Sequence, residues 1–449
     1  MLPRELLAEV TFIGTCEAAK IQRVHCIRNH CFKKITGEIG GQKIKKATAP
    51  SKQKKNGQIA IVSSPVGYRG LPKSSGYSPS KAALRLLYVF SPASDDDDAI
   101  ADITVTPPST YKFERNGATT VSYSGQTARL KMASELYSGM KSSSSTKVGL
   151  DNMFNNGTGF SDTTLDGTGK KVGNKTFASS VASSTVKPMF DDMITDFTSN
   201  VIPNWSTTAA NGTAGKMTDS KRTVYINAKG HELTQLFTKG LIGGMATDQI
   251  VNGYLSPAKL DGAKAGNDAG TMYSDTANYT AMEHYWDEGF GYLYGEEADE
   301  TNPTLGDGVL LSKYAKKVND SNSPGIAKVI YDAFIMGRAA IVAKNYTVRD
   351  AQAKIIQMHI SKIIGYKAVD YLNDYVSKAA AGTPADAIHA LSEGYGFIMS
   401  LQVTNDGTGK PYFTNSEVNA MLAKIDNFWT VSSADCTAMA NEIKTKMNL

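Results

Sequence analysis

Apolar side chains recur at three- and four-residue steps through most of the second part of the chain. Leu233, Leu236, Phe237 and Leu241 form one such series, and a similar series runs over residues 355–363. This spacing places the residues on one face of a helix. Alternating apolar and polar runs of comparable strength are absent from the sequence. The pattern therefore predicts an all-α fold, in which helices pair into bundles.

The same periodicity sets the bounds that we expect for individual helices. Gly, Asn, Thr and Ser dominate the segments between them, and two of these segments, 155–176 and 260–272, are predicted to be long polar loops. The predicted helices cover residues 124–140, 187–202, 222–256, 275–295, 323–344, 348–379, 384–402, 414–425 and 433–447.

Charge divides the chain of 449 residues into two parts. Residues 1–92 contain 16 Lys and Arg against 4 Glu, whereas the remainder contains 32 Lys and Arg against 39 Asp and Glu. The lysines of this basic N-terminal arm are not interleaved with aromatic residues, so the arm is not predicted to bind nucleic acid. No run of eighteen or more apolar residues occurs, which predicts that there is no transmembrane segment.

A stretch inside the basic arm, residues 57–85, has the pattern of a catalytic site. A short apolar run, "QIAIVSS", is followed by Tyr77-Ser-Pro-Ser-Lys81, and Ser64 lies thirteen residues before the tyrosine. This stretch resembles the short-chain dehydrogenase/reductase family. The resemblance implies that Ser64 orients a carbonyl, Tyr77 transfers a proton and Lys81 lowers the pKa of the tyrosine.

That family also needs a glycine-rich turn for its nicotinamide cofactor, far upstream of the tyrosine. The segment 36–41, "TGEIGG", has the wrong spacing and follows no clear strand. We therefore interpret residues 57–85 as a truncated α/β fragment without a cofactor domain, and we do not expect NAD(P) binding. An active reductase through Ser64, Tyr77 and Lys81 is the least favoured function.

Residues 93–108 are predicted to form a flexible tether. They combine small residues, the acidic tetrad Asp95–Asp98 and a Thr/Pro stretch. Bacterial surface lipoproteins place such a tether directly after their lipid-bearing cysteine. No cysteine precedes the aspartates directly, and the sequence has no clear signal peptide.

Residues 109–449 resemble a family of Bacteroidetes lipoproteins, domain of unknown function 4856, which we relate to the imelysins. The resemblance rests on ordered blocks that include "DNMFNNGTGFSD", "GHELTQLFTKGLIGG", "HYWDEGFGYLYG", "AFIMGRAAI" and "HALSEGYGFIMSL". It implies paired helical bundles with an internal repeat, and export to the periplasm or the outer-membrane surface. It also implies outer-membrane uptake components as partners, because imelysin relatives are linked with iron uptake.

One nine-residue pattern occurs twice, starting at His284 and at His389. Each copy reads His, three residues, Glu, Gly, aromatic, Gly, aromatic. Because residues four apart share a helix face, His284 lies beside Glu288 and His389 beside Glu393. If the two helices met at a shared cleft, these four residues and Asp287 would form a candidate site for a divalent or ferric ion.

The same pattern has a packing interpretation, which we weigh more heavily. Glycines flanked by aromatic residues allow two helices to cross closely, and a His–Glu pair can satisfy its own hydrogen bonds inside a core. Glycine in a helix costs about 1 kcal/mol relative to alanine, so something approaches the backbone closely in either case. An internal repeat alone explains the duplication.

The block "KGHELTQLFTKG" is a further candidate site. Imelysins carry Gly-x-His-x-x-Glu on a helix, and the matching positions are Gly230, Glu232 and Gln235. His231 is displaced by about 100° around the helix and is not expected to substitute. Position 235 is not His, so an HExxH zinc peptidase is excluded at this site. Glu232 and Gln235 remain candidates for binding a polar ligand or for capping the bundle interior.

Arg338 lies among apolar residues on a predicted core-facing helix. A buried Arg needs a carboxylate partner, and Glu232, Glu288 and Glu393 are the candidates. We favour a structural salt bridge over anion binding by Arg338.

The leading functional hypothesis is an exported binding protein that holds a metal ion or a small polar ligand between its bundles. The alternative is a metal-assisted or acid–base hydrolase that uses the His, Glu and Asp residues. A purely structural or adhesion-like surface protein is also compatible with the sequence. The absence of a catalytic motif favours a binding protein over an enzyme.

Overall fold

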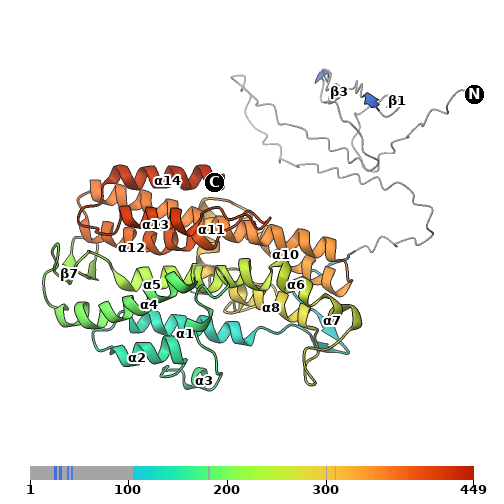
Figure 1. Cartoon of the computed structure of the whole chain (residues 1–449), viewed down its shortest axis with the longest axis horizontal. Coiled ribbons are helices and arrows are strands. Elements are labelled where there is room, and N and C mark those ends of the chain that lie inside the picture. Colours follow the sequence, from blue (N-terminus) through green and yellow to red (C-terminus); the bar gives the residue numbers. More distant parts are fainter. Residues whose placement is uncertain are drawn as a thin grey trace, which may run out of the picture. The chain divides into compact units, whose positions relative to one another are not determined.

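The apolar series seen in the sequence form the helices that organise the structure (Figure 1). The chain divides into two units, Met1–Ala101 and Asp102–Leu449. The predicted dehydrogenase-like fragment, with Ser64, Tyr77 and Lys81, lies outside the described residues, as does most of the predicted tether. The computed structural model describes residues 105–179, 183–299, 301–308 and 310–449, together with the backbone of four short strands between His25 and Lys43.

Two long helical rods run through the second unit. In the first rod, α5 (Leu233–Leu241) continues through two π-helical segments, η5 (Ile242–Thr247) and η6 (Gln249–Tyr254). The second rod is α11 (Tyr346–Ala380), whose 35 residues span about 52 Å. Helix α11 contacts both η5 and η6, so the two rods form the common centre of the fold.

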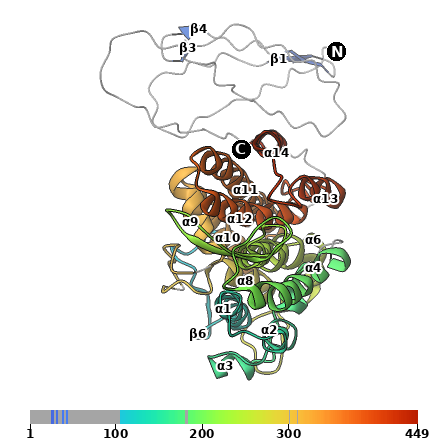
Figure 2. The ribbon, with the colours of Figure 1, turned by 90° about the vertical axis from the view of Figure 1, so that its left-hand side faces the viewer.

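Each end of the rods carries its own set of helices. Helix α8 (Ala281–Tyr294) packs against η6, and α10 (Ile326–Val342) packs against α8 and α11. At the other end, α12 (Pro384–Ser400) packs against both α5 and α11. Figure 2 shows α11 to α14 on one side of this unit and α1 to α3 on the opposite side. The two copies of the repeated nonapeptide thus lie on α8 and α12, at different ends of the first rod.

The remaining helices are shorter or cover these rods. The α-helices among them are α1 (Ser124–Gly139), α2 (Lys147–Asp151), α3 (Thr163–Asp166), α4 (Ser183–Asp196), α6 (Pro257–Gly262), α7 (Lys264–Ala269), α9 (Leu311–Ser321), α13 (Asn415–Lys424) and α14 (Ser433–Met447). Single turns of π or 3₁₀ helix are η1 (Asn152–Asn156), η2 (Gly173–Lys175), η3 (Phe197–Val201), η4 (Ile202–Asn204) and η7 (Leu401–Val403).

Strands are few and short in the described residues, and they pair as antiparallel two-stranded sheets. The pair β7 and β8 is the longest, with Gly215 opposite Ile226 and Thr218 opposite Thr223. The strand bounds are β1 (His25–Ile27) with β2 (His30–Phe32), β3 (Glu38–Ile39) with β4 (Gln42–Lys43), β5 (Glu114–Arg115) with β6 (Ala118–Thr119), and β7 (Gly215–Thr218) with β8 (Thr223–Ile226).

Local sequence explains where the central helices begin. Thr280 caps α8 by accepting a hydrogen bond from the Glu283 backbone N–H, and the Glu283 side chain accepts one from the Thr280 backbone in return. Helix α12 begins with Pro384, whose missing N–H has no partner to lose in a first turn. Asn345 caps α11 by accepting from the Val348 backbone N–H.

The structure confirms the all-α fold and corrects some of the predicted bounds. The predicted helix 222–256 is wrong at its start, where residues 223–226, "TVYI", form strand β8. Their β-branched and aromatic side chains alternate in burial, a period-two run that is too short to stand out beside the helical pattern. The predicted loop 260–272 contains the end of α6 and all of α7, and the predicted loop 155–176 contains α3. These helices are too short to give a periodic signal.

Candidate functional site

The first His–Glu pair lies on the face of α8 that is directed toward η6 and the start of α1. His284 Nε2 is 3.9 Å from Glu288 Oε1, and the ring packs between the Tyr273 and Tyr279 rings at 4.8 and 4.9 Å. Glu288 accepts hydrogen bonds from Gln126 Nε2 at 2.8 Å and from the Tyr254 hydroxyl at 3.2 Å. Burial lowers the pKa of His284, against the opposing effect of Glu288.

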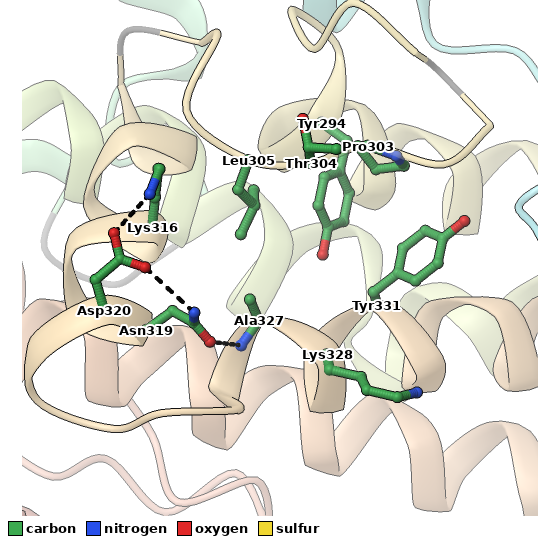
Figure 3. A pocket seen from close by; sticks show the side chains of 10 residues that line it. All are labelled: Tyr294, Pro303, Thr304, Leu305, Lys316, Asn319, Asp320, Ala327, Lys328 and Tyr331. Carbon is green, nitrogen blue, oxygen red and sulfur yellow. Dashed lines mark hydrogen bonds and ion pairs between the residues drawn. The ribbon is translucent and has the colours of Figure 1, made fainter.

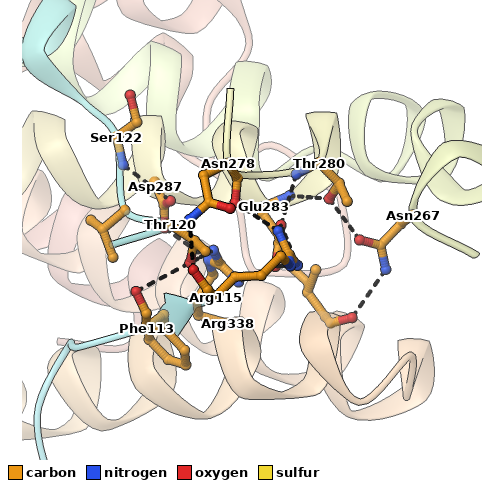
Figure 4. A network of polar contacts seen from close by, with 12 residues as sticks. Phe113, Arg115, Thr120, Ser122, Asn267, Asn278, Thr280, Glu283, Asp287 and Arg338 are labelled. Carbon is orange, nitrogen blue, oxygen red and sulfur yellow. Dashed lines mark hydrogen bonds and ion pairs between the residues drawn. The ribbon is translucent and has the colours of Figure 1, made fainter. Parts of the chain in front are cut away.

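A neighbouring face of the same helix holds a buried ion network (Figure 4). Arg338 Nε donates to Asp287 Oδ1 at 3.0 Å, and Arg338 Nη1 donates to Glu283 Oε1 at 3.0 Å. Asp287 also accepts from the Tyr111 hydroxyl at 2.7 Å, and Thr120 accepts from Arg338 Nη2 at 2.9 Å. Burial raises the pKa of Asp287 to about 6, although Arg338 acts to lower it.

The carboxylate partner predicted for Arg338 is present, but its identity was predicted wrongly. The partners are Glu283 and Asp287 rather than Glu232, Glu288 or Glu393. Successive residues on a helix lie about 100° apart, which turns Asp287 away from its neighbour Glu288. Asp287 therefore belongs to the ion network and not to the His284 pair.

The second His–Glu pair, on α12, has a richer set of charged neighbours. His389 Nδ1 is 2.6 Å from Glu232 Oε2, and His389 Nε2 is 3.5 Å from Glu393 Oε2. Lys239 Nζ is 3.1 Å from Glu393 Oε1, which also accepts from the Tyr314 hydroxyl at 3.3 Å. Although burial acts to raise the pKa of Glu393, Lys239 and His389 hold it below its usual value.

The two pairs do not meet in a shared cleft. Gln126, which contacts Glu288, and Tyr137, whose ring lies 5.9 Å from Lys239 Nζ, are both on α1. They lie about 16 Å apart along the axis of that helix. The five predicted metal ligands are thus divided between the His284 pair, the ion network and the His389 pair. Within the described part of the chain, no group of three or more His, Cys, Asp or Glu side chains is placed to hold a metal ion.

Glu232 and Gln235, the predicted ligand-binding residues of the third block, lie beside the His389 pair. The Glu232 backbone N–H donates to Ser392 Oγ at 3.0 Å, which joins the start of α5 to α12. Gln235 Nε2 is 3.4 Å from Glu232 Oε1, and its buried Oε1 has no hydrogen-bond partner. Arg338, the other predicted ligand-binding residue, is fully enclosed in the α8 network.

A cavity of about 350 Å³ opens next to this region, between α4, the start of α5 and α12. Met189, Met193 and Leu236 are among its apolar lining residues, and Asp192 and Asp196 are its acidic ones. Its volume falls in the usual range for small-molecule sites, about 300–1,000 Å³. A larger cavity of about 650 Å³ lies beside the start of α1, but its lining includes none of the predicted site residues.

His231 lines the 350 Å³ cavity, although its position in the sequence motif does not predict a role in a site. Its ring packs against Phe428 at 4.4 Å and Tyr395 at 5.4 Å. Burial lowers the pKa of His231 to about 4, so the ring is neutral at pH 7. Its Nε2 lies 2.9 Å from the Asp426 carbonyl oxygen, which assigns the proton to Nε2 and leaves Nδ1 as an acceptor.

Several residues of the site had no signal of their own in the sequence. Gln126, Tyr254, Lys239 and Tyr314 reach the His–Glu pairs from distant segments, and only the fold brings them close. The Asp192 and Asp196 spacing of four did place both carboxylates on one helix face, which could have been recognised.

Comparison with protein families shows which kind of domain this is. The family model described as "Domain of unknown function (DUF4856)" matches residues 108–449. The chain belongs to this family. No curated protein and no solved structure matches the chain.

In this DUF4856 domain, both copies of the nonapeptide use their second glycine for close helix contact. A Cβ added at Gly291 would lie 2.4 Å from Tyr123 Cβ, and one at Gly396 would lie 2.5 Å from Lys239 Cβ. The first glycines, Gly289 and Gly394, have nearest neighbours at 3.3 Å. Close packing thus accounts for the glycines without a ligand.

None of the helices in the described ranges combines the length and apolar character needed to cross a lipid bilayer.

Proposed function

We propose that the DUF4856 domain is a small-molecule-binding domain and that its ligand occupies the 350 Å³ cavity beside His231. The ligand in this proposal has an apolar or aromatic body and a positively charged amine. The observation that carries the proposal is that the lining of the cavity combines several apolar side chains with two carboxylates.

The apolar residues that line the cavity suit a ligand with a flat hydrocarbon body. Met189 and Met193 are adaptable thioethers that pack well against rings, and Tyr395 supplies an aromatic face. Leu233 and Leu236 are further apolar residues of the lining. A ligand of this kind would be removed from water along most of its length, which is the main favourable term in binding.

The carboxylates of Asp192 and Asp196 suit a cation or another strong hydrogen-bond donor. Asp196 is held in place by Asn227 Nδ2 at 2.8 Å, and Asp192 lies one helical turn before it. Lys229 also lines the cavity, but its ammonium is already 2.8 Å from Asp426 Oδ1. His231 adds the acceptor Nδ1. The polar groups therefore favour an ammonium over a carboxylate or a phosphate.

The geometry favours this ligand over a divalent or ferric ion. The candidate metal ligands His284, Glu288, His389 and Glu393 belong to two clusters about 16 Å apart along α1. The imidazole of His389 faces carboxylates at both ring nitrogens, Glu232 at Nδ1 and Glu393 at Nε2. One metal ion cannot use both nitrogens of a ring. The same separation argues against a hydrolase that needs all the His and Glu groups at one reaction centre.

The proposal is tested by calorimetry on the full chain with tyramine, agmatine and choline. Tyrosol, which has the body of tyramine with a hydroxyl in place of the ammonium, is the matched control ligand. We expect at least one amine to bind. If tyramine binds, tyrosol should bind at least tenfold more weakly. The double variant Asp192→Asn/Asp196→Asn should lose at least tenfold in affinity for the amine that binds. No heat with any amine, or unchanged affinity in the double variant, would sink the proposal.

We also propose that this domain is exported and displayed at the periplasm or the outer-membrane surface, where uptake components would be its partners. The acidic and Thr/Pro-rich composition of residues 93–108 supports this. Fractionation of the native cells with an antibody to the domain tests it, and recovery in the cytoplasm alone would contradict it.

A further inference from the structure

A further cavity, of about 260 Å³, shares no lining residue with the His231 cavity (Figure 3). It is bounded by the end of α8, the 301–308 loop, α9 and α10. Tyr294, Leu305 and Tyr331 form its central walls, and Lys316 and Asn319 lie at one side. None of the residues discussed as candidate ligands above lines this cavity.

The Tyr294 hydroxyl is the unusual feature of this cavity. The side chain is 1% exposed, and its hydroxyl has no hydrogen-bond partner. In Figure 3 the hydroxyl points into the space between Leu305 and Tyr331. The neighbouring Tyr331 hydroxyl, in contrast, donates to the Thr301 carbonyl and accepts from the Tyr111 backbone N–H. A buried hydroxyl without a partner is unfavourable, and such groups call for an explanation.

The charged groups around the cavity and the Asn319 amide oxygen are already paired. Lys316 Nζ is 2.6 Å from Asp320, and Lys328 Nζ is 2.5 Å from Asp332. Asn319 Oδ1 accepts from the backbone N–H groups of Gly325 and Ala327. These ion pairs balance the charge at the rim. The cavity therefore offers the buried Tyr294 hydroxyl, aromatic and aliphatic surface, and no unpaired charge among the groups just described.

The size of the cavity limits what can fill it. A volume of about 260 Å³ corresponds to roughly eight water molecules. It is also slightly below the range of about 300 Å³ and more that is usual for drug-sized ligands. One ordered water could satisfy the hydroxyl, but it would leave most of the space beside the Tyr331 ring and Leu305 unfilled.

The backbone at the wall of the cavity supports a binding role. Leu305 has a φ of 53°, a left-handed conformation that is unfavourable for a side chain with a Cβ. Gly306 follows it with a φ of 121°. The strained conformation holds the buried Leu305 side chain against the cavity, and such strain is concentrated at functional positions in proteins.

We propose that this cavity is a second ligand site, which takes an uncharged, hydroxylated molecule of monosaccharide size. The Tyr294 hydroxyl hydrogen-bonds a ligand hydroxyl at the base of the cavity. The C–H face of the ligand packs against the Tyr331 ring, and Leu305 and Pro303 close the remaining sides. The site is separate from the His231 cavity and does not depend on the function proposed for it.

The test uses saturation-transfer NMR and thermal shift on the full chain, with D-glucose, D-galactose and D-mannose as probes. We expect transfer to at least one sugar, and an affinity at least tenfold lower in Tyr294→Phe, which removes only the hydroxyl. Asp192→Asn/Asp196→Asn, in the other cavity, is the matched control and is expected to bind the sugar as the wild type does.

A second measurement keeps the test independent of protein stability. Without sugar, Tyr294→Phe is expected to be at least as stable as the wild type in thermal unfolding, because the hydroxyl has no partner to lose. Absence of transfer to all three sugars overturns the proposal, as does equal binding by Tyr294→Phe. A Tyr294→Phe variant that is clearly less stable without ligand also overturns it, because the hydroxyl would then have a fixed partner inside the protein.

Discussion

Helices α8 and α12 carry the same nine-residue pattern but bury different chemistry. The second glycine of each copy makes a close contact with a neighbouring segment, whereas the two His–Glu pairs have different partners. The residues at which the two copies differ determine the other ion pairs and hydrogen bonds that each helix makes. Glu283 and Asp287 on α8 bind Arg338, whereas the equivalent positions on α12 are Ile388 and Ser392. Ser392 accepts one neutral hydrogen bond from the Glu232 backbone.

This comparison separates the residues that both copies need for packing from the residues that are specific to one copy. The second glycine of each copy is needed because a neighbouring segment approaches within the radius of a side chain. The acidic residues of α8 are an addition to the pattern, because α12 packs well without them. The second glycines that the two copies share are explained by close packing. The positions at which the copies differ determine the local electrostatics.

The largest effect is expected in the ion network, which is present at α8 and has no counterpart at α12. Arg338→Met removes the cation beside Asp287 and leaves a buried carboxylate without its charge partner. We expect a loss of about 3–5 kcal/mol in the free energy of unfolding, measured by urea denaturation. Lys328→Met, which breaks an exposed pair on the same helix, is the control and should cost at most about 1 kcal/mol. Similar losses in both variants would contradict the proposed importance of burial.

The next effect concerns His231, beside α12. Its folded pKa of about 4 lies below the usual value of 6.5, so folding requires the neutral ring, and stability falls as the pH drops from 6.5 toward 4. His231→Gln keeps a donor for the Asp426 carbonyl but does not titrate. Relative to this variant, the wild type should lose about 3 kcal/mol between pH 7 and pH 4 in urea denaturation. Parallel pH profiles of the two proteins would show that the buried imidazole has no such effect.

A third prediction tests whether the two copies really pack alike. Gly291→Ala and Gly396→Ala should each destabilise the protein by about 1–3 kcal/mol, because the new Cβ would clash with a neighbouring segment. Gly289→Ala and Gly394→Ala should change stability by less than about 1 kcal/mol, since alanine's better helix propensity offsets the tighter contact. Thermal and urea unfolding of the four variants would measure this. If the first and second glycines respond alike, close contact is not the reason for the pattern.

The smallest effect is expected at the neutral counterpart of Asp287. Ser392→Ala removes the acceptor of the Glu232 backbone N–H and should cost about 1 kcal/mol in urea denaturation. Thr437→Ala, at an exposed position on α14, controls for the substitution itself. A loss as large as that in Arg338→Met would remove the distinction between the two helices.

Much of the architecture could be predicted because long helices repeat their signal many times. Helix α11 was predicted as residues 348–379 and spans Tyr346–Ala380, and α14 has the predicted bounds. Strand β8 was missed because four residues give only two alternations, too few to outweigh the adjoining helical pattern. Neither α6 nor α7 exceeds six residues, so both are too short to give a periodic signal.

The sites were harder to predict than the fold, because their contacts join segments that are far apart in the chain. The need of Arg338 for an acidic partner followed from burial alone, but the three expected candidates did not include its actual partners, Glu283 and Asp287. The proximity of His389 to Glu232 depends on how α12 crosses α5, which no local pattern contains. His231 was set aside because it was one position from the expected register, although the cavity lies on that side of the chain.

Helix α11 has a mechanical consequence for the whole domain. Because α11 is one uninterrupted helix that contacts the helices around both α8 and α12, it connects the two ends rigidly. Neither end has a complete set of neighbours without it, so a proteolytic cut or an inserted flexible segment near the middle of α11 should dismantle both ends together. The two ends therefore form a single cooperative body, which could not be divided into two freestanding pieces.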